Sequence, residues 1–139
     1  MSNSLRTLVG TFLALASQAV WSLDLSGRWT LTVENLDHTV VAAMTVRFTQ
    51  EAARSCLGGS WRQVEVESPT STDARFFPVT EPLSYSVEES TLTIGRNEVC
   101  DAYLHLTGKL GKLPVRGDYV GFGWGSARQI GHFSLDRAP

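Results

Sequence analysis

From Leu23 onward, hydrophobic and polar residues alternate along much of the chain, as they do in strands that bury one face. In the run 28–34, Trp29, Leu31 and Val33 share one face, and polar residues occupy the other. In the next run, 39–50, five apolar residues share a face: Val40, Ala42, Met44, Val46 and Phe48. Both runs therefore predict half-buried strands.

The same alternation recurs at 60–68, 83–94, 102–110, 115–124 and 128–137, and residues 83–94 form a hairpin pattern around a turn at 88–90. A Pro-, Ser- and Thr-rich stretch, 69–82, is the longest irregular segment, with a short edge segment expected at 75–79. About eight short antiparallel strands in succession predict an all-β, up-and-down barrel, because closure removes exposed edges. A two-sheet sandwich is the alternative.

The N-terminal segment has a different composition. Arg6 precedes an apolar core at 7–16, and small residues at 17–19 follow it. This core is shorter than the ~20 residues that a membrane-spanning helix requires. We therefore expect a signal peptide at 1–22, one barrel domain at 23–139, no membrane insertion, and a periplasmic or secreted protein; a buried N-terminal helix is the alternative.

The number and distribution of charged residues argue against some classes of partner. The chain has 12 basic and 14 acidic residues, and removal of residues 1–19 takes away one arginine and no acid. The basic residues are scattered, which argues against nucleic acid and against an anionic membrane surface. A small apolar ligand or a protein partner remains.

The chain has two cysteines, Cys56 and Cys100. In an exported protein an even number of cysteines favours a disulfide. A metal pair is the alternative, but the three histidines are far from both cysteines in the sequence. We expect the disulfide, with no metal and no cofactor.

Trp29 lies just inside the first strand, two residues after Gly27. In a small barrel such a ring can plug one end, where it buries about 150–250 Å². The first and last strands of a closed barrel pair, so Arg137 is expected near Trp29. An arginine over an indole adds a cation–π contact of about 0.5–2 kcal/mol.

These residues resemble the three short motifs of the lipocalin or calycin group: Gly27 and Trp29 near the start, Asp118 and Tyr119 ahead of the last strand, and Arg137 at the end. The resemblance implies an eight-stranded antiparallel barrel that often binds small apolar molecules, with the motif residues holding the closed end. The chain is shorter than that pattern and has Gly117 where threonine is common.

The segment 25–31, after the predicted signal peptide, also resembles the start of small periplasmic inhibitors of bacterial metalloproteases. That resemblance implies a filled barrel with one disulfide and a free N-terminal arm that enters the protease. The arm before Gly27 is short here, and the cysteine spacing is wider than in that group.

The stretch 117–131 is rich in glycine, with Gly117, Gly121 and Gly123 on the face of Tyr119. Glycines in strands indicate sharp bending or close approach by another group. We favour bending, with large neighbouring side chains over the glycines. A small-walled cavity lined by Tyr119 is a second interpretation, and an outward apolar patch of Phe122 and Trp124 is a third.

We predict a non-catalytic binding protein, because no nucleophile or acid–base motif emerges. His105 and His132 fall on the polar faces of their strands, where solvated positions are expected, and His38 falls in a turn. If the barrel holds a small ligand, the inward pattern predicts these lining residues: Trp29, Met44, Phe48, Tyr85, Leu104, Tyr119 and Phe133.

Overall fold

A computed structural model describes residues 23–123 and 125–139; the predicted signal peptide and Trp124 lie outside them. The described chain is all-β. The eight strands are β1 (Trp29–Asn35), β2 (Val40–Ala52), β3 (Arg62–Ser71), β4 (Leu83–Glu88), β5 (Thr91–Arg96), β6 (Leu104–Lys109), β7 (Val115–Gly123) and β8 (Ser126–Arg137).

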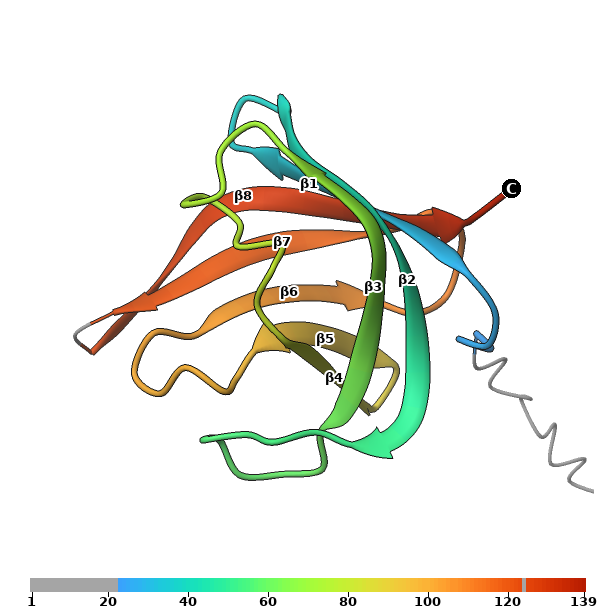
Figure 1. Ribbon diagram of the computed structural model, residues 1–139, viewed down its shortest axis with the longest axis horizontal. Helices are drawn as coiled ribbons and strands as arrows, with labels where there is room; N and C mark the ends of the chain where they lie inside the picture. Colours follow the sequence, from blue (N-terminus) through green and yellow to red (C-terminus); the bar gives the residue numbers. More distant parts are fainter. Residues whose placement is uncertain (1–22, 124) are drawn as a thin grey trace, which may run out of the picture.

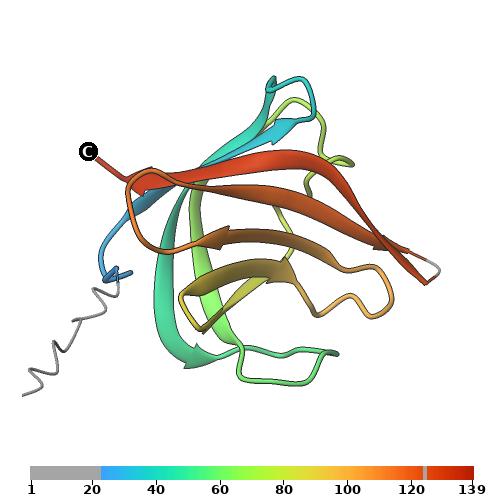
Figure 2. The ribbon, with the colours of Figure 1, turned by 180° about the vertical axis from the view of Figure 1, so that it is seen from behind.

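Each strand pairs antiparallel with the next, and β8 pairs with β1, which closes the barrel (Figure 1). The closing register places Trp29 opposite Arg137 and Asn35 opposite Gly131. We call the end with Trp29 and Arg137 the base, and the end with the β5–β6 loop and the β7–β8 hairpin the mouth; they lie to the right and left in Figure 1 and exchange sides in Figure 2. The predicted up-and-down barrel is confirmed.

The predicted inward faces fill the barrel. Trp29, Leu31 and Val33 are fully buried in β1, while Arg47 of β2 points outward and is exposed. Val40 is an exception, since it is 49% exposed and Val41 is buried instead. The β1–β2 register shifts after Val33, and such a shift at a strand end changes which side chain faces the core. The expected inward position of Val40 is therefore wrong.

A large side chain lies over Gly117 of β7, as expected, whereas the space beside Gly123 is open. A Cβ at Gly117 would overlap the carbonyl oxygen of Thr107 and come within 2.6 Å of the Phe133 ring. The Phe133 ring also covers Gly108, where a Cβ would lie 3.0 Å from it. Large side chains thus occupy the space that these glycines leave open.

The β3–β4 loop, residues 72–82, contains no strand, so the edge segment expected at 75–79 is wrong. The loop turns at Asp73, whose side chain accepts bonds from the backbone of Arg75 and Phe76. Its two phenylalanines then pack against Tyr119, with ring centroids 5.3 Å (Phe76) and 5.5 Å (Phe77) away. The loop therefore contributes to the core.

The predicted disulfide is present. Cys56 of the β2–β3 loop is bonded to Cys100 of the β5–β6 loop, with Cα atoms 5.5 Å apart and a sequence separation of 44. The backbone N–H of Cys56 also donates to the carbonyl of Asn97 at 2.9 Å. The bond ties the loop that leads to the mouth onto the end of β2.

Candidate functional site

The base is sealed by Trp29 and Arg137, as the sequence predicts. The guanidinium carbon of Arg137 lies 4.0 Å from the centroid of the indole. Its terminal nitrogens donate to the backbone carbonyls of Ser26 and Asp24, and the indole N–H donates to the carbonyl of Leu25 at 2.9 Å. These contacts also fasten the segment before β1 across the barrel end.

The seven predicted ligand-lining residues do not line a single pocket. Six of them are buried side chains of the core: Trp29, Met44, Phe48, Tyr85, Tyr119 and Phe133. They belong to one hydrophobic core cluster, in which Phe48 makes edge-to-face contacts with Trp29 at 6.4 Å and with Tyr85 at 5.0 Å. Leu104 is the exception, since it is half-buried near the mouth.

The two buried tyrosines use their hydroxyl groups within the fold. The Tyr85 hydroxyl donates to the carbonyl of Thr49 at 2.7 Å, and the Tyr119 hydroxyl donates to the carbonyl of Phe76 at 2.6 Å. Burial strongly raises the pKa of Tyr119, so this hydroxyl keeps its proton. The Tyr119 bond therefore holds the β3–β4 loop onto the barrel, whereas the Tyr85 bond links β4 to β2.

A groove of about 830 Å³ lies at the mouth, between the β5–β6 loop and the β7–β8 hairpin. Tyr103 and Phe122 supply its aromatic surface, and Asp101 is its one charged lining residue. Its other described lining residues are small: Ala102, Gly123, Gly125, Ser126 and Ala127. We call this the aromatic groove.

A second groove of about 400 Å³ adjoins it. The two grooves share five lining residues: Ala102, Tyr103, Phe122, Gly123 and Ser126. The second groove adds Arg96 and Arg128, together with the apolar side chains of Leu104 and Ile130. We call this the arginine groove; no carboxylate lines it.

The two arginines differ in their bonding. Arg96 is 15% exposed, donates to Glu81 at 2.7 Å, and donates through two nitrogens to the carbonyl of Ala102. Arg128 is exposed and lies within ion-pair distance of no carboxylate in the described chain. Neither arginine was predicted from the sequence, although Leu92 and Ile94 are buried and the same alternation continues to Arg96.

An aromatic cluster flanks the mouth on the outside of the barrel. The ring of His105 lies 4.9 Å from that of Phe122 and 5.7 Å from that of Trp61. Its Nε2 is 3.0 Å from the side-chain oxygen of Asn97, which is buried and donates to Ser84. The expected solvated position of His105 is therefore wrong, and burial lowers the pKa of His105.

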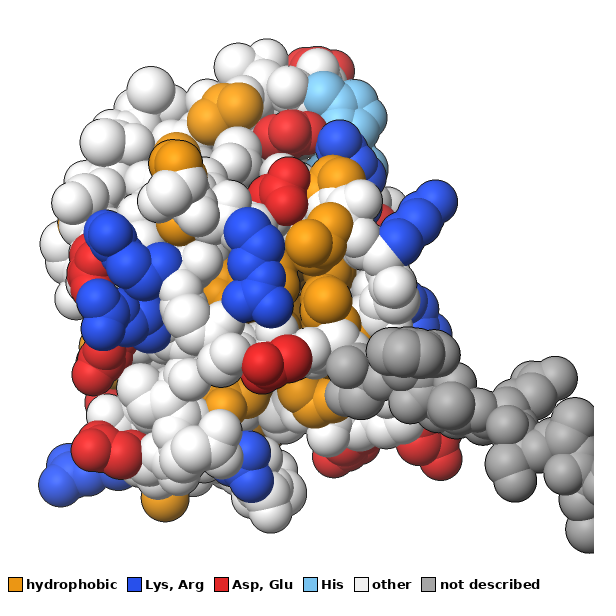
Figure 3. Space-filling model, turned by 90° about the vertical axis from the view of Figure 1, so that its right-hand side faces the viewer, with side chains coloured by type: hydrophobic (Ala, Val, Ile, Leu, Met, Phe, Trp, Pro, Cys, Tyr) orange, Lys and Arg blue, Asp and Glu red, His pale blue; other side chains and the backbone are white. Residues whose placement is uncertain are grey.

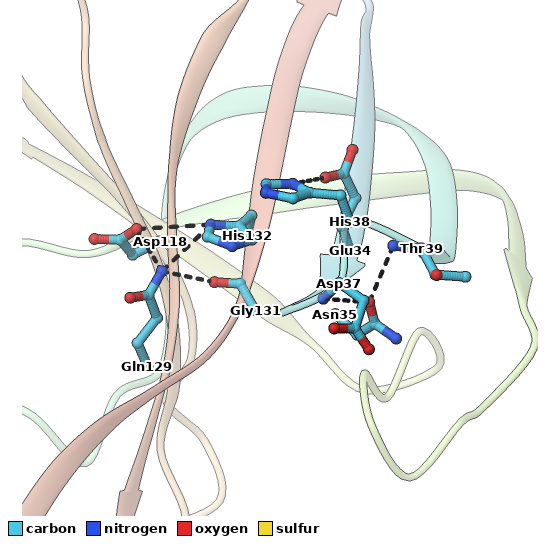
Figure 4. A network of polar contacts seen from close by, with 9 residues as sticks. All are labelled: Glu34, Asn35, Asp37, His38, Thr39, Asp118, Gln129, Gly131 and His132. Atoms are coloured by element: carbon cyan, nitrogen blue, oxygen red, sulfur yellow. Dashed lines mark hydrogen bonds and ion pairs between the residues drawn. The ribbon is translucent and has the colours of Figure 1, made fainter.

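The other two histidines lie side by side, His38 in the β1–β2 turn and His132 on β8. The rings of His38 and His132 stack with centroids 4.3 Å apart (Figure 4). Nδ1 of His38 is 2.9 Å from Glu34, whereas Nδ1 of His132 is 3.9 Å from Asp118. No group of three His, Cys, Asp or Glu side chains that could hold a metal occurs among residues 23–123 and 125–139.

Charges of both signs are interspersed on the base side of the molecule (Figure 3). Arg28 and Arg47, for example, both pair with Glu67, at 3.0 and 3.1 Å. A groove of about 590 Å³ lies beside them, and Phe48 and Tyr85 reach its wall. The structure thus places two of the predicted ligand residues at a groove on the base side and Leu104 at the mouth.

No helix able to cross a membrane occurs in the part of the chain that the structure describes. Comparisons with protein-family models, with curated proteins and with solved structures give no significant match.

Proposed function

We propose that this chain is an exported, non-catalytic binding protein, and that its site for a small apolar ligand is the mouth rather than the deep interior. The aromatic groove carries this proposal. It offers about 830 Å³, within the range of about 300–1,000 Å³ that is common for small-molecule sites. Its walls are mainly aromatic and small residues, which suit an apolar ligand.

The packing of the interior supports the choice of the mouth. Trp29, Tyr119 and Phe133 are at most 2% exposed and contact neighbouring side chains or backbone. A ligand among them would have to displace close-packed side chains, whereas Tyr103 and Phe122 already face solvent in part. Of the seven residues first predicted, Leu104 belongs to this site because it lines the adjoining groove.

The disulfide supports an exported location, since such bonds persist in oxidising compartments. The barrel and the Trp29–Arg137 contact support kinship with the calycins. Both inferences are part of the proposal.

A protein-binding role, such as protease inhibition, is the second candidate. The filled interior favours it. The segment that would act as an arm does not, because Arg137 bonds the carbonyls of Asp24 and Ser26, and Leu23 and Leu25 pack against the core.

The neutral fluorophore N-phenylnaphthylamine tests the ligand proposal, since its emission rises in apolar surroundings. We expect saturable binding, and we expect Phe122→Ser to weaken it about tenfold, because roughly 1.4 kcal/mol is a reasonable share for one partly exposed aromatic side chain. Val87→Ser is the matched control, since Val87 is 43% exposed but lines neither mouth groove. Equal loss in both variants, or no saturable binding, would refute a mouth site.

A further inference from the structure

We propose that the ligand of the mouth is an organic anion, with its apolar body in the aromatic groove and its carboxylate or sulfonate in the arginine groove. This inference rests on the proposed function and specifies the ligand class. It follows from the joining of the two grooves, which share a wall that includes Tyr103 and Phe122.

Charge is distributed unequally between the two grooves. Arg96 and Arg128 line one groove, and Asp101 lines the other. An anionic group is attracted to the first groove and repelled from the second, so this difference orients an amphipathic anion. Apolar side chains of Leu104 and Ile130 also line this groove, and the partial burial of Arg96, which is 15% exposed, strengthens a charge-assisted hydrogen bond to it.

Both arginines have donors available. A guanidinium carries five N–H groups. Arg96 directs three of its hydrogen bonds to Glu81 and Ala102, which leaves one N–H on each terminal nitrogen. Arg128 makes no hydrogen bond or ion pair within the described chain through its side chain, and it is exposed. Arg96 is thus a fixed donor, and Arg128 supplies the charge that Glu81 does not neutralise.

Two probes with one aromatic framework test this inference: neutral N-phenylnaphthylamine and anionic anilinonaphthalene sulfonate. We expect the native protein to bind the sulfonate more tightly, and added salt to reduce that preference. Arg128→Gln should weaken sulfonate binding about three- to fivefold, as expected for one exposed ion pair. It should leave binding of the neutral probe unchanged.

Arg116→Gln is the matched control, because it removes the same charge from an exposed position of β7 that lines neither mouth groove. If the neutral probe binds but the sulfonate gains nothing, or both arginine variants weaken it equally, the anion inference is overturned and the proposed function stands. If neither probe binds saturably, the proposed function itself fails.

Discussion

The base and the mouth of the barrel each have an aromatic ring and an arginine, but the burial and the bonding of these residues differ between the two ends. At the base, Trp29 is fully buried and Arg137 lies over it, bonded to backbone carbonyls of the preceding segment. At the mouth, Phe122 is 39% exposed, and Arg128 has no ion pair in the described chain.

This contrast shows that residue type does not decide between closure and binding. The guanidinium at the base is surrounded by main-chain acceptors, so its donors are used within the fold. The one at the mouth extends from a hairpin whose neighbouring residues are small, so its donors face solvent. The arginine over the indole stabilises the protein at the base, whereas Phe122 and Arg128 both line the arginine groove and are available to a ligand.

The largest expected effect comes from removing the ring at the base. Trp29→Ala should lower the free energy of unfolding by about 3–5 kcal/mol, because it leaves a cavity in close-packed surroundings. Phe122→Ala should cost less than about 1 kcal/mol, since its ring is partly exposed. Urea unfolding at equilibrium measures both, and similar losses at the two ends would contradict the comparison.

Removal of the disulfide should have the next largest effect. Replacing Cys56 and Cys100 together by serine releases a loop with a sequence separation of 44, at a cost of up to about 4 kcal/mol in the chain-entropy model. Because Cys100 holds the loop that carries Tyr103, probe binding at the mouth should weaken too. Urea unfolding and probe titration below the transition separate these effects; unchanged stability would rule out a structural role for the bond.

The two arginines allow a comparison with the same change of charge. Arg137→Gln should lower stability by about 1–2 kcal/mol, since it removes a cation–π contact and two bonds to the backbone. Arg128→Gln should change it by less than about 0.5 kcal/mol, as for other surface substitutions. Thermal unfolding of both variants is the measurement, and a larger loss from Arg128→Gln would reverse the assignment of roles.

The strands and the base could be predicted from the sequence because both depend on local patterns. Alternation with a period of two identifies the buried face of each strand, and closure then brings Trp29 to Arg137. The alternation gave the wrong face for Val40, because a register shift after Val33 changes which residues of β2 point inward near the hairpin.

The mouth could not be predicted in the same way, because its grooves depend on the path of a loop and a hairpin. Leu104 was expected to line an interior cavity and Phe122 to belong to an outward apolar patch, whereas Tyr103, Arg96 and Arg128 were missed. A charged residue at the end of a strand suggests that the alternation of inward and outward side chains has ended, although Arg96 continues the inward face of β5. His105 shows the same limit, since the neighbouring rings of Trp61 and Phe122 belong to another loop and another strand.

The smallest expected effect is a dependence of stability on pH at the mouth. Burial lowers the pKa of His105 from 6.5, so the unfolded chain binds this proton more readily than the folded protein. The stability contributed by neutral His105 is therefore present above about pH 6.5 and is lost as the pH falls through the lower pKa of the folded state. His105→Gln keeps a donor for Asn97 but does not titrate, and it should reduce the loss of stability between about pH 7 and pH 5.

His38→Gln removes an exposed histidine as a control, and urea unfolding over this pH range compares the two variants with the native chain. Identical pH profiles for His105→Gln and the native chain would show that burial of this ring has no part in the acid response.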